Sequence, residues 1–205
     1  MAELKSMLDE ILEAWRDVRE GIVEEVENIP AGKFDFRPTP EVRSVREQVQ
    51  HILEVAMMMT GEFTRPDTDL HRAPWPKLLA MYAKPAYRAK TKGELLSLLR
   101  SQIADAEKMF RAQGEIALWQ HHKRFDGKSG TKLAWVQHGI AQEWYHRGQL
   151  ALHQFHTRFD GRRGTKLAWV QHGIAQEWYH RGQLALYARL MGLVPALTQR
   201  IRGEA

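Results

Sequence analysis

The sequence predicts an all-α protein, a four-helix bundle that carries an additional copy of its last helix. Apolar residues recur at three- and four-residue spacing in long segments, and no segment alternates convincingly as a strand. A stretch of 22 residues also occurs twice in the second half of the chain. Because 205 residues suffice for one bundle with a substantial core, we expect a single domain over residues 1–205.

The first predicted helix covers residues 3–27. Its apolar positions lie on one side of a helical wheel, as expected for a helix that packs against others. They are Leu4, Leu8, Ile11, Trp15, Val18, Ile22 and Val26. Pro30, Gly32, Pro38 and Pro40 then indicate a loop.

The second predicted helix begins at Ser44. Ser44 and Glu47 have the spacing of a capping box, in which each side chain accepts a hydrogen bond from a free backbone N–H. Its apolar stripe is Val45, Val49, Ile52, Leu53, Ala56 and Phe63. Residues 64–85 contain four prolines, so we expect them to be mostly irregular.

The third predicted helix begins with a second capping box, formed by Thr91 and Glu94. Its apolar stripe continues to Phe110 through Leu95, Leu98, Leu99, Ile103 and Ala106. These three helices provide three sides of the expected bundle.

The fourth helical segment is present twice. Residues 131–152 read TKLAWVQHGIAQEWYHRGQLAL, and residues 165–186 repeat them letter for letter. With the similar flanks HKRFDGKSG and HTRFDGRRG, the repeat is 34 residues long and covers about 122–155 and 156–189. Such identity indicates a recent or deliberate duplication, because the units of an old solenoid array would have diverged, and two units are too few for a solenoid.

The two copies cannot form one continuous helix with a common apolar face. At about 100° per residue, a shift of 34 residues turns the second copy roughly 160° from the first. Asp160, Gly161 and Gly164 indicate a break between them. Met191-Gly192 and Pro195 indicate a normal helix end after the second copy.

Only one copy can complete the bundle, and the connecting loops favour the first. The first copy follows the third helix through a shorter loop, which lowers the entropy cost of closure slightly. The second copy would then expose its apolar stripe, formed by Val170, Ile174, Trp178 and Leu184. We therefore expect a homodimer or a larger symmetric oligomer, with the extra helix at the interface.

Composition narrows the possible functions. The chain has no cysteine, which excludes disulfides, thiolate metal ligands and a cysteine nucleophile. The net charge is +5, but basic residues are interleaved with acidic ones, so a nucleic-acid partner is not favoured. No apolar run has the length of a signal peptide or a membrane span, so we expect a cytoplasmic protein.

A polar stripe on the fourth helix is the main candidate for chemistry. His138, Gln142 and His146 recur every four residues and stack along one side. Side chains one turn apart can bind one divalent metal ion, whereas His138 and His146 are about 12 Å apart along the axis. His51 on the second helix is the natural additional ligand. The alternative is a solvated polar face.

We interpret the other histidines as surface residues, namely His71, His121, His122, His153 and His156. We interpret the run Met57-Met58-Met59 as part of the core.

Several segments resemble the DinB/YfiT-like superfamily. FDFRPTPEVRSVREQVQHI, residues 34–52, is similar to the entry to its second helix. TKGELLSLLR from Thr91 fits the third helix, and EWYHRGQLALYARLMGLVP, residues 177–195, fits the last helix and its exit. The resemblance covers nearly the whole chain when one copy of the repeat is counted.

The resemblance implies a DinB-like four-helix bundle with a divalent metal, such as zinc, nickel or manganese, held by three histidines. One comes from the second helix and two, four residues apart, from the last. The matching positions are His51, Gln142 and His146, or Gln176 and His180 in the second copy. Glutamine therefore replaces one histidine in both copies, which is expected to weaken metal binding.

The resemblance also implies a thiol-dependent transferase, acting with a low-molecular-weight thiol on a small-molecule substrate, or a metal-dependent hydrolase. In either, a metal with an open position lowers the pKa of a bound thiol or water. The alternative is a non-catalytic binding or structural bundle with a degraded metal site, which the two glutamines favour. A weaker alternative is DNA binding, which would be sensitive to salt.

Overall fold

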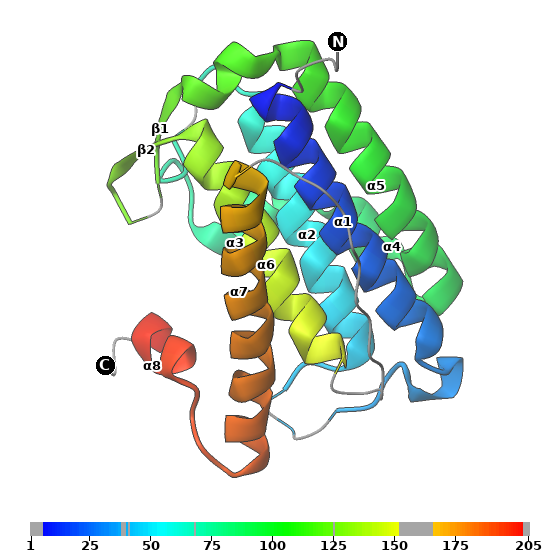
Figure 1. Ribbon diagram of the computed structural model, residues 1–205. Helices are drawn as coiled ribbons and strands as arrows, with labels where there is room; N and C mark the ends of the chain where they lie inside the picture. Colours follow the sequence, from blue (N-terminus) through cyan, green and yellow to red (C-terminus); the bar gives the residue numbers. More distant parts are fainter. Residues whose placement is uncertain are drawn as a thin grey trace.

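The computed structural model describes residues 6–37, 40, 42–67, 69–124, 126–151 and 166–202. Four long helices form the bundle, namely α1 (Met7–Asn28), α2 (Val45–Phe63), α5 (Lys92–Gln113) and α6 (Lys132–Ala151). They close a ring in the order α1, α5, α2, α6, in which each helix packs against two others (Figure 1). The all-α bundle expected from the sequence is confirmed.

Capping interactions set where the first helices begin. Ser44 and Glu47 form the capping box that begins α2, and Thr91 and Glu94 form the one that begins α5. α1 begins with a third capping box, between Ser6 and Asp9, which the sequence reading missed. The first helix is described from Met7, so residues 3–5 of its predicted range lie outside the described part.

The segment after α2 differs from the prediction. Residues 64–85 were expected to be mostly irregular, but they contain α3 (Trp75–Tyr82) and the start of α4 (Lys84–Arg88). Pro76 and Pro85 lie in the first turns of these helices, where a missing N–H costs nothing. These prolines therefore begin helices instead of preventing them.

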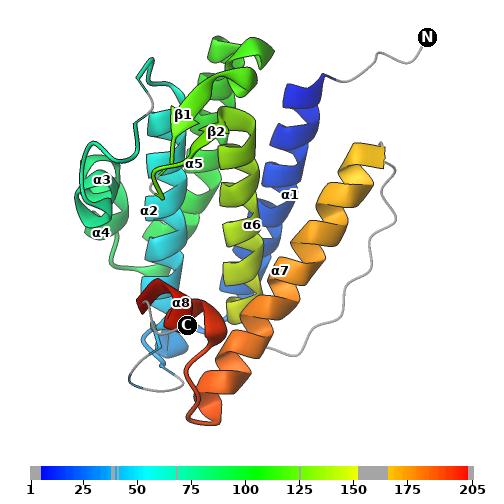
Figure 2. The same ribbon diagram turned by 90° about the vertical axis from the view of Figure 1, so that its left-hand side faces the viewer.

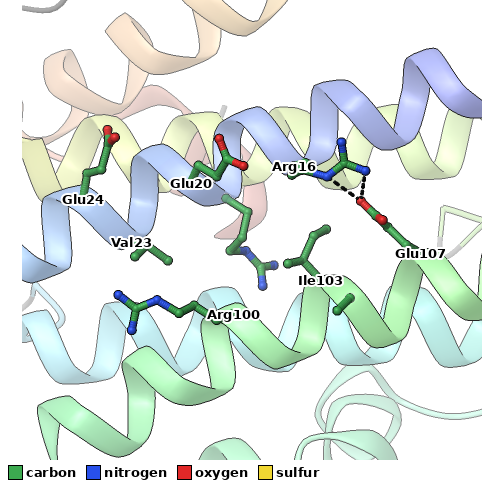
Figure 3. Close-up of a pocket in the computed structure, with 9 residues that line it drawn as sticks. Arg16, Glu20, Val23, Glu24, Arg100, Ile103 and Glu107 are labelled. Atoms are coloured by element: carbon green, nitrogen blue, oxygen red, sulfur yellow. Dashed lines mark hydrogen bonds and ion pairs between the residues drawn. The ribbon is translucent and has the colours of Figure 1, made fainter.

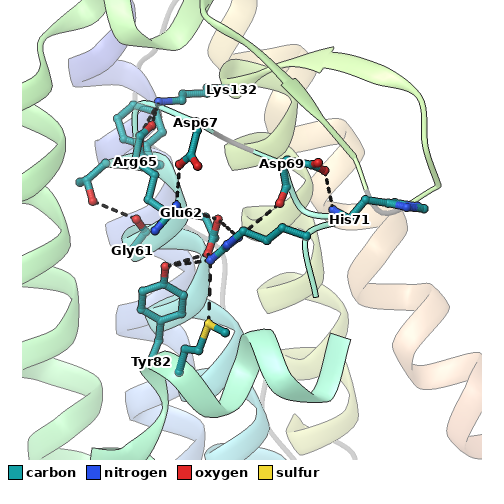
Figure 4. Close-up of polar contacts among 12 residues, drawn as sticks. Gly61, Glu62, Arg65, Asp67, Asp69, His71, Tyr82 and Lys132 are labelled. Atoms are coloured by element: carbon teal, nitrogen blue, oxygen red, sulfur yellow. Dashed lines mark hydrogen bonds and ion pairs between the residues drawn. The ribbon is translucent and has the colours of Figure 1, made fainter. Parts of the chain in front are cut away.

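A network around Glu62 holds this segment against the bundle (Figure 4). The Glu62 carboxylate accepts hydrogen bonds from Tyr82 Oη (2.7 Å) and from the Arg72 guanidinium (2.7 Å at Oε2). Buried Lys132 donates from Nζ to the carbonyl oxygens of Phe63 (2.7 Å) and Arg65 (3.0 Å). The first residue of α6 is thus tied to the C-terminus of α2.

A short hairpin precedes α6, although no strand was expected. Strands β1 (His121–Lys123) and β2 (Ser129–Thr131) pair antiparallel, with His122 opposite Gly130. Three-residue strands are too short for an alternating pattern to be recognised. His122 is buried on this hairpin, so its interpretation as a surface residue was wrong.

Two 3₁₀ turns complete the chain before β1. They are η1 (Ala31–Lys33), between α1 and α2, and η2 (Glu115–Trp119), between α5 and β1.

The first copy of the repeat forms the bundle helix, as its shorter connection predicted. Its apolar side packs into the core through Val136, Ile140, Trp144 and Leu150. Met58 and Met59 are core residues too, as expected. The second copy forms α7 (Lys166–Leu190), which lies beside α6 and touches α1 (Figure 2). The predicted break at Asp160, Gly161 and Gly164 lies outside the described residues.

α7 ends where the sequence indicated. Gly192 has a φ of 75°, a left-handed conformation that glycine adopts without strain. The short helix α8 (Ala196–Arg202) follows.

A polar network crosses the core of the bundle. The buried Glu143 carboxylate accepts hydrogen bonds from Trp15 Nε1 (2.7 Å) and Arg19 Nε (2.9 Å), both on α1. Arg19 also donates from Nη1 to the Gln102 side chain on α5 (2.6 Å), and Gln102 donates to Thr60 on α2 (3.3 Å). One connected network therefore joins all four helices of the bundle.

Candidate metal centre

The bundle brings together the two histidines that the sequence singled out from different helices. The ring centroids of His51 on α2 and His146 on α6 are 4.9 Å apart, and the rings meet edge to face at 81°. His146 is 5% exposed, so this part of the polar stripe is not a solvated face. The half-buried His51 side chain lies at the edge of the same site.

Two glutamines hold the His146 ring. Its Nδ1 atom lies 2.5 Å from Gln48 Nε2 and 2.9 Å from Gln149 Oε1. The Nε2 atom is buried and has no hydrogen-bond partner among the described residues. With a proton on Nδ1, donated to Gln149, Nε2 carries the buried lone pair that a metal ion requires. This tautomer also requires the Gln48 amide to turn its oxygen toward Nδ1, because two N–H groups cannot hydrogen-bond to each other.

His51 has a similar arrangement on its own helix. Its Nδ1 atom lies 2.5 Å from Glu54 Oε1, one turn further along α2. Tyr87 donates a hydrogen bond to the other oxygen of Glu54 (2.7 Å). Carboxylates that bind one ring nitrogen of a histidine fix its tautomer and leave the other nitrogen free for a metal.

Electrostatics keep both rings neutral. Burial lowers the pKa of His146 well below its ordinary value, and the neighbouring His51 lowers it further. Burial also lowers the pKa of His51, although its hydrogen bond to Glu54 opposes that shift. Because a metal competes with protons for imidazole nitrogen, neutral rings favour metal binding.

The remaining predicted ligands lie in different surroundings. Gln142 is half-buried, one turn before His146 on α6. On α7, Gln176 is half-buried, and His180 is exposed and hydrogen-bonded to Gln183 (3.1 Å). His138 is exposed, close to Trp178. Within the described residues, no group of three or more histidine or acidic side chains is placed to hold one metal ion.

Sequence reasoning missed two residues that orient the histidines, Gln48 and Glu54. They precede and follow His51 by three residues, so all three share one side of α2. The spacing was visible, but nothing in the sequence showed that Gln48 would reach across to His146 on another helix.

One small cavity adjoins the site, and a larger groove lies elsewhere on the bundle. A cavity of about 10 Å³ lies beside Gln48 and Gln149 and is also lined by Arg43 and by Leu186 of α7. That volume holds about one water molecule. A larger open groove of about 410 Å³ lies between α1 and α5, with Val23 and Ile103 between charged side chains (Figure 3). It contains neither His51 nor His146.

Comparison with known proteins identifies the family of the chain. The sequence profile of the DinB family matches residues 3–155, and a second match covers residues 154–204. The chain belongs to the DinB family. The first match spans the whole bundle with the first copy of the repeat, and the second begins where that copy ends.

Solved structures show that this DinB protein shares its fold with two others. One is a mycothiol-dependent maleylpyruvate isomerase, with 13% identity and a TM-score of 0.52. The other is a histidine-to-alanine mutant of a protein with the same description, with 12% identity and a TM-score of 0.55. Each alignment covers 69% of this chain and 60% of the other. No curated protein matches the DinB chain in sequence.

The DinB chain contains no described helix that is long and apolar enough to cross a membrane.

Proposed function

We propose that this DinB protein is a metal-dependent enzyme of the thiol-transferase or hydrolase type, with His51 and His146 as metal ligands. The observation that most supports a metal site is the buried Nε2 atom of His146, which has no hydrogen-bond partner among the described residues and lies next to the His51 ring. Gln142 is the proposed third protein group, through its amide oxygen. A metal held there would supply an open position that lowers the pKa of a bound thiol or water.

The chain's own residues prepare this site. Gln149 and Glu54 accept the Nδ1 protons of the two histidines, so that both Nε2 atoms carry lone pairs. Burial keeps His146 neutral. The fit is incomplete compared with three histidines, because an amide oxygen is a weak ligand for zinc or nickel.

The repeat supplies a matched control for a metal-binding test. Protein purified without a nickel column is analysed for metal by mass spectrometry and titrated with zinc, nickel and manganese by calorimetry. We expect His51→Ala and His146→Ala to abolish binding, whereas His180→Ala, at the equivalent position of α7, leaves it unchanged. Protein that contains no metal and gains no thermal stability from any of the three ions would overturn the proposal.

The rival function is a non-catalytic bundle, which the two glutamines favour. Gln142→His distinguishes a weakened metal centre from a polar helix face that binds no metal. If the site is a metal centre, this substitution raises zinc affinity by about an order of magnitude or more, because imidazole is the better ligand. Gln113→His, at an exposed position of α5 with no histidine one turn away, is the control and is expected to change nothing. Unchanged affinity in both variants favours the non-catalytic bundle.

A low-molecular-weight thiol is the proposed co-substrate of a small-molecule reaction. The mycothiol dependence in the names of the two structural neighbours supports this choice. Because the chain has no cysteine, any thiolate-to-cobalt charge-transfer band of cobalt-loaded protein must come from an added thiol. We expect such a band with a thiol and none in His146→Ala. Its absence from cobalt-loaded wild type would exclude direct thiol binding to the metal.

We also propose that the chain associates into a homodimer or larger oligomer. α7 and the residues after it expose seven large apolar side chains, which supports self-association. They are Ile174, Leu184, Tyr187, Leu190, Met191, Leu193 and Val194.

A further inference from the structure

The contacts between α6 and α7 are reciprocal. The ring centroids of Trp144 and Tyr179 are 6.5 Å apart, and those of Tyr145 and Trp178 are 6.4 Å apart, with similar edge-to-face angles of 80° and 87°. Each pair is converted into the other when residues of the first copy are exchanged for their equivalents 34 positions later. The two helices therefore meet through the same side and in the same register.

The closest contacts between the two helices are also reciprocal between the two copies of the repeat. A Cβ atom on Gly148 would lie 2.1 Å from the carbonyl oxygen of Tyr179, and one on Gly182 would lie 2.1 Å from that of Tyr145. Only glycine fits at either place. The helices run in the same direction and cross at an angle (Figure 2), so the reciprocal contacts place a local two-fold axis between them.

Identical sequences permit this arrangement but do not require it. A tethered extra helix could pack through any side and at any register. A contact in which residue i meets j and j meets i is the isologous type found in symmetric dimers. α7 thus occupies the place that the last helix of a second subunit would take.

The far side of α7 leaves room for that second subunit. Two apolar residues that α6 buries in its bundle have exposed equivalents on α7. Leu150 is 1% exposed and its equivalent Leu184 is 66% exposed, and Ile140 and Ile174 differ in the same sense. The side of α7 that would face a second bundle is therefore open.

We propose that the side of the last helix carrying Tyr145 and Gly148, or Tyr179 and Gly182, is a self-association surface whose partner is a second copy of this chain. In the duplicated chain α7 covers that surface from within. A chain with one copy of the repeat pairs its last helix with that of another subunit, and the two bundles lie on opposite sides of the pair.

A single-copy variant tests the proposal directly. Deletion of residues 124–157 removes one repeat unit and leaves Gly182 on the remaining helix. By sedimentation, we expect this variant to be a dimer at micromolar concentration, and the same variant with Gly182→Leu to be a monomer of unchanged helix content. A folded single-copy variant that remains monomeric, or a dimer that is insensitive to Gly182→Leu, would overturn the proposal.

A second experiment uses the full-length chain and does not depend on the deletion. Gly182→Leu separates α7 from α6 and leaves the intact Gly148 surface of α6 free to pair with another subunit. The control Gly148→Leu/Gly182→Leu also separates the helices but has no intact surface. We expect α7 to lose hydrogen-exchange protection in both, while only Gly182→Leu gains an additional association. Equal masses for the two variants would contradict a self-association surface.

Discussion

Glu143 and Glu177 have the same local sequence but different surroundings. Glu143 is 3% exposed and pairs with Arg19 and Trp15, whereas Glu177 lies exposed on α7. A buried carboxylate that is satisfied by three hydrogen bonds does not destabilise the core, but its partners depend on it. The same residue type is therefore part of a core network in one copy and a surface charge in the other.

Glu143→Ala tests this difference at the residue scale. The substitution leaves the Arg19 guanidinium buried without its counter-charge, so we expect it to lower the free energy of unfolding by about 3–5 kcal/mol. Glu177→Ala should change it by less than about 0.5 kcal/mol, as is usual at exposed positions. Urea denaturation followed by circular dichroism measures both. Similar losses in the two variants would show that the network does not stabilise the bundle.

At the scale of elements, a comparison of α6 with α7 separates the contribution of helix propensity to stability from that of packing. Residues 132–151 and 166–185 are identical, so intrinsic propensity is the same in both helices. α6 buries its apolar side between α1 and α2, and α7 rests on α6 and α1. Differences in stability between the two helices therefore come from tertiary contacts.

Leu150→Ala and Leu184→Ala form a matched pair for this comparison. Leu150→Ala creates a cavity in the core and is expected to cost about 2–5 kcal/mol of unfolding free energy. Leu184 is mostly exposed within one chain, so Leu184→Ala should cost less than about 0.5 kcal/mol when unfolding is measured at a dilution at which the chain is monomeric. Thermal and urea unfolding of both variants provide the values. A large loss for Leu184→Ala would mean that the outer side of α7 is covered in solution.

For the whole molecule, the exposed apolar side of α7 predicts association. Light scattering at micromolar concentration is expected to show a dimer or larger oligomer, because an apolar stripe of this length is costly to leave in water. Ile174→Lys together with Leu184→Lys should shift the equilibrium toward monomer, since it introduces like charges on that surface. Ser97→Lys together with Ser101→Lys, at exposed neutral positions of α5, provides a charge-matched control. A monomeric wild-type chain would refute the association.

Much of the site followed from the sequence. Spacing placed Gln142 and His146 on a polar stripe and pointed to His51 as the additional ligand, and the family resemblance implied the same three positions. The sequence did not reveal that His146 would be buried between Gln48 and Gln149, because that depends on how α2 and α6 are aligned. The role of Glu54 also depends on where Tyr87 of α4 lies.

The sequence by itself determined the helices of the bundle, the caps at Ser44 and Thr91, and the existence of two equivalent last helices, since these depend on local periodicity and local hydrogen bonds. The shorter connecting loop favoured the first copy for the core, but only the tertiary structure decided how the second copy pairs with it. Identical residues have identical propensities, so that pairing rests on contacts between distant segments. Burial of Glu143 and exposure of Glu177, and the glycine contacts between α6 and α7, come from packing alone.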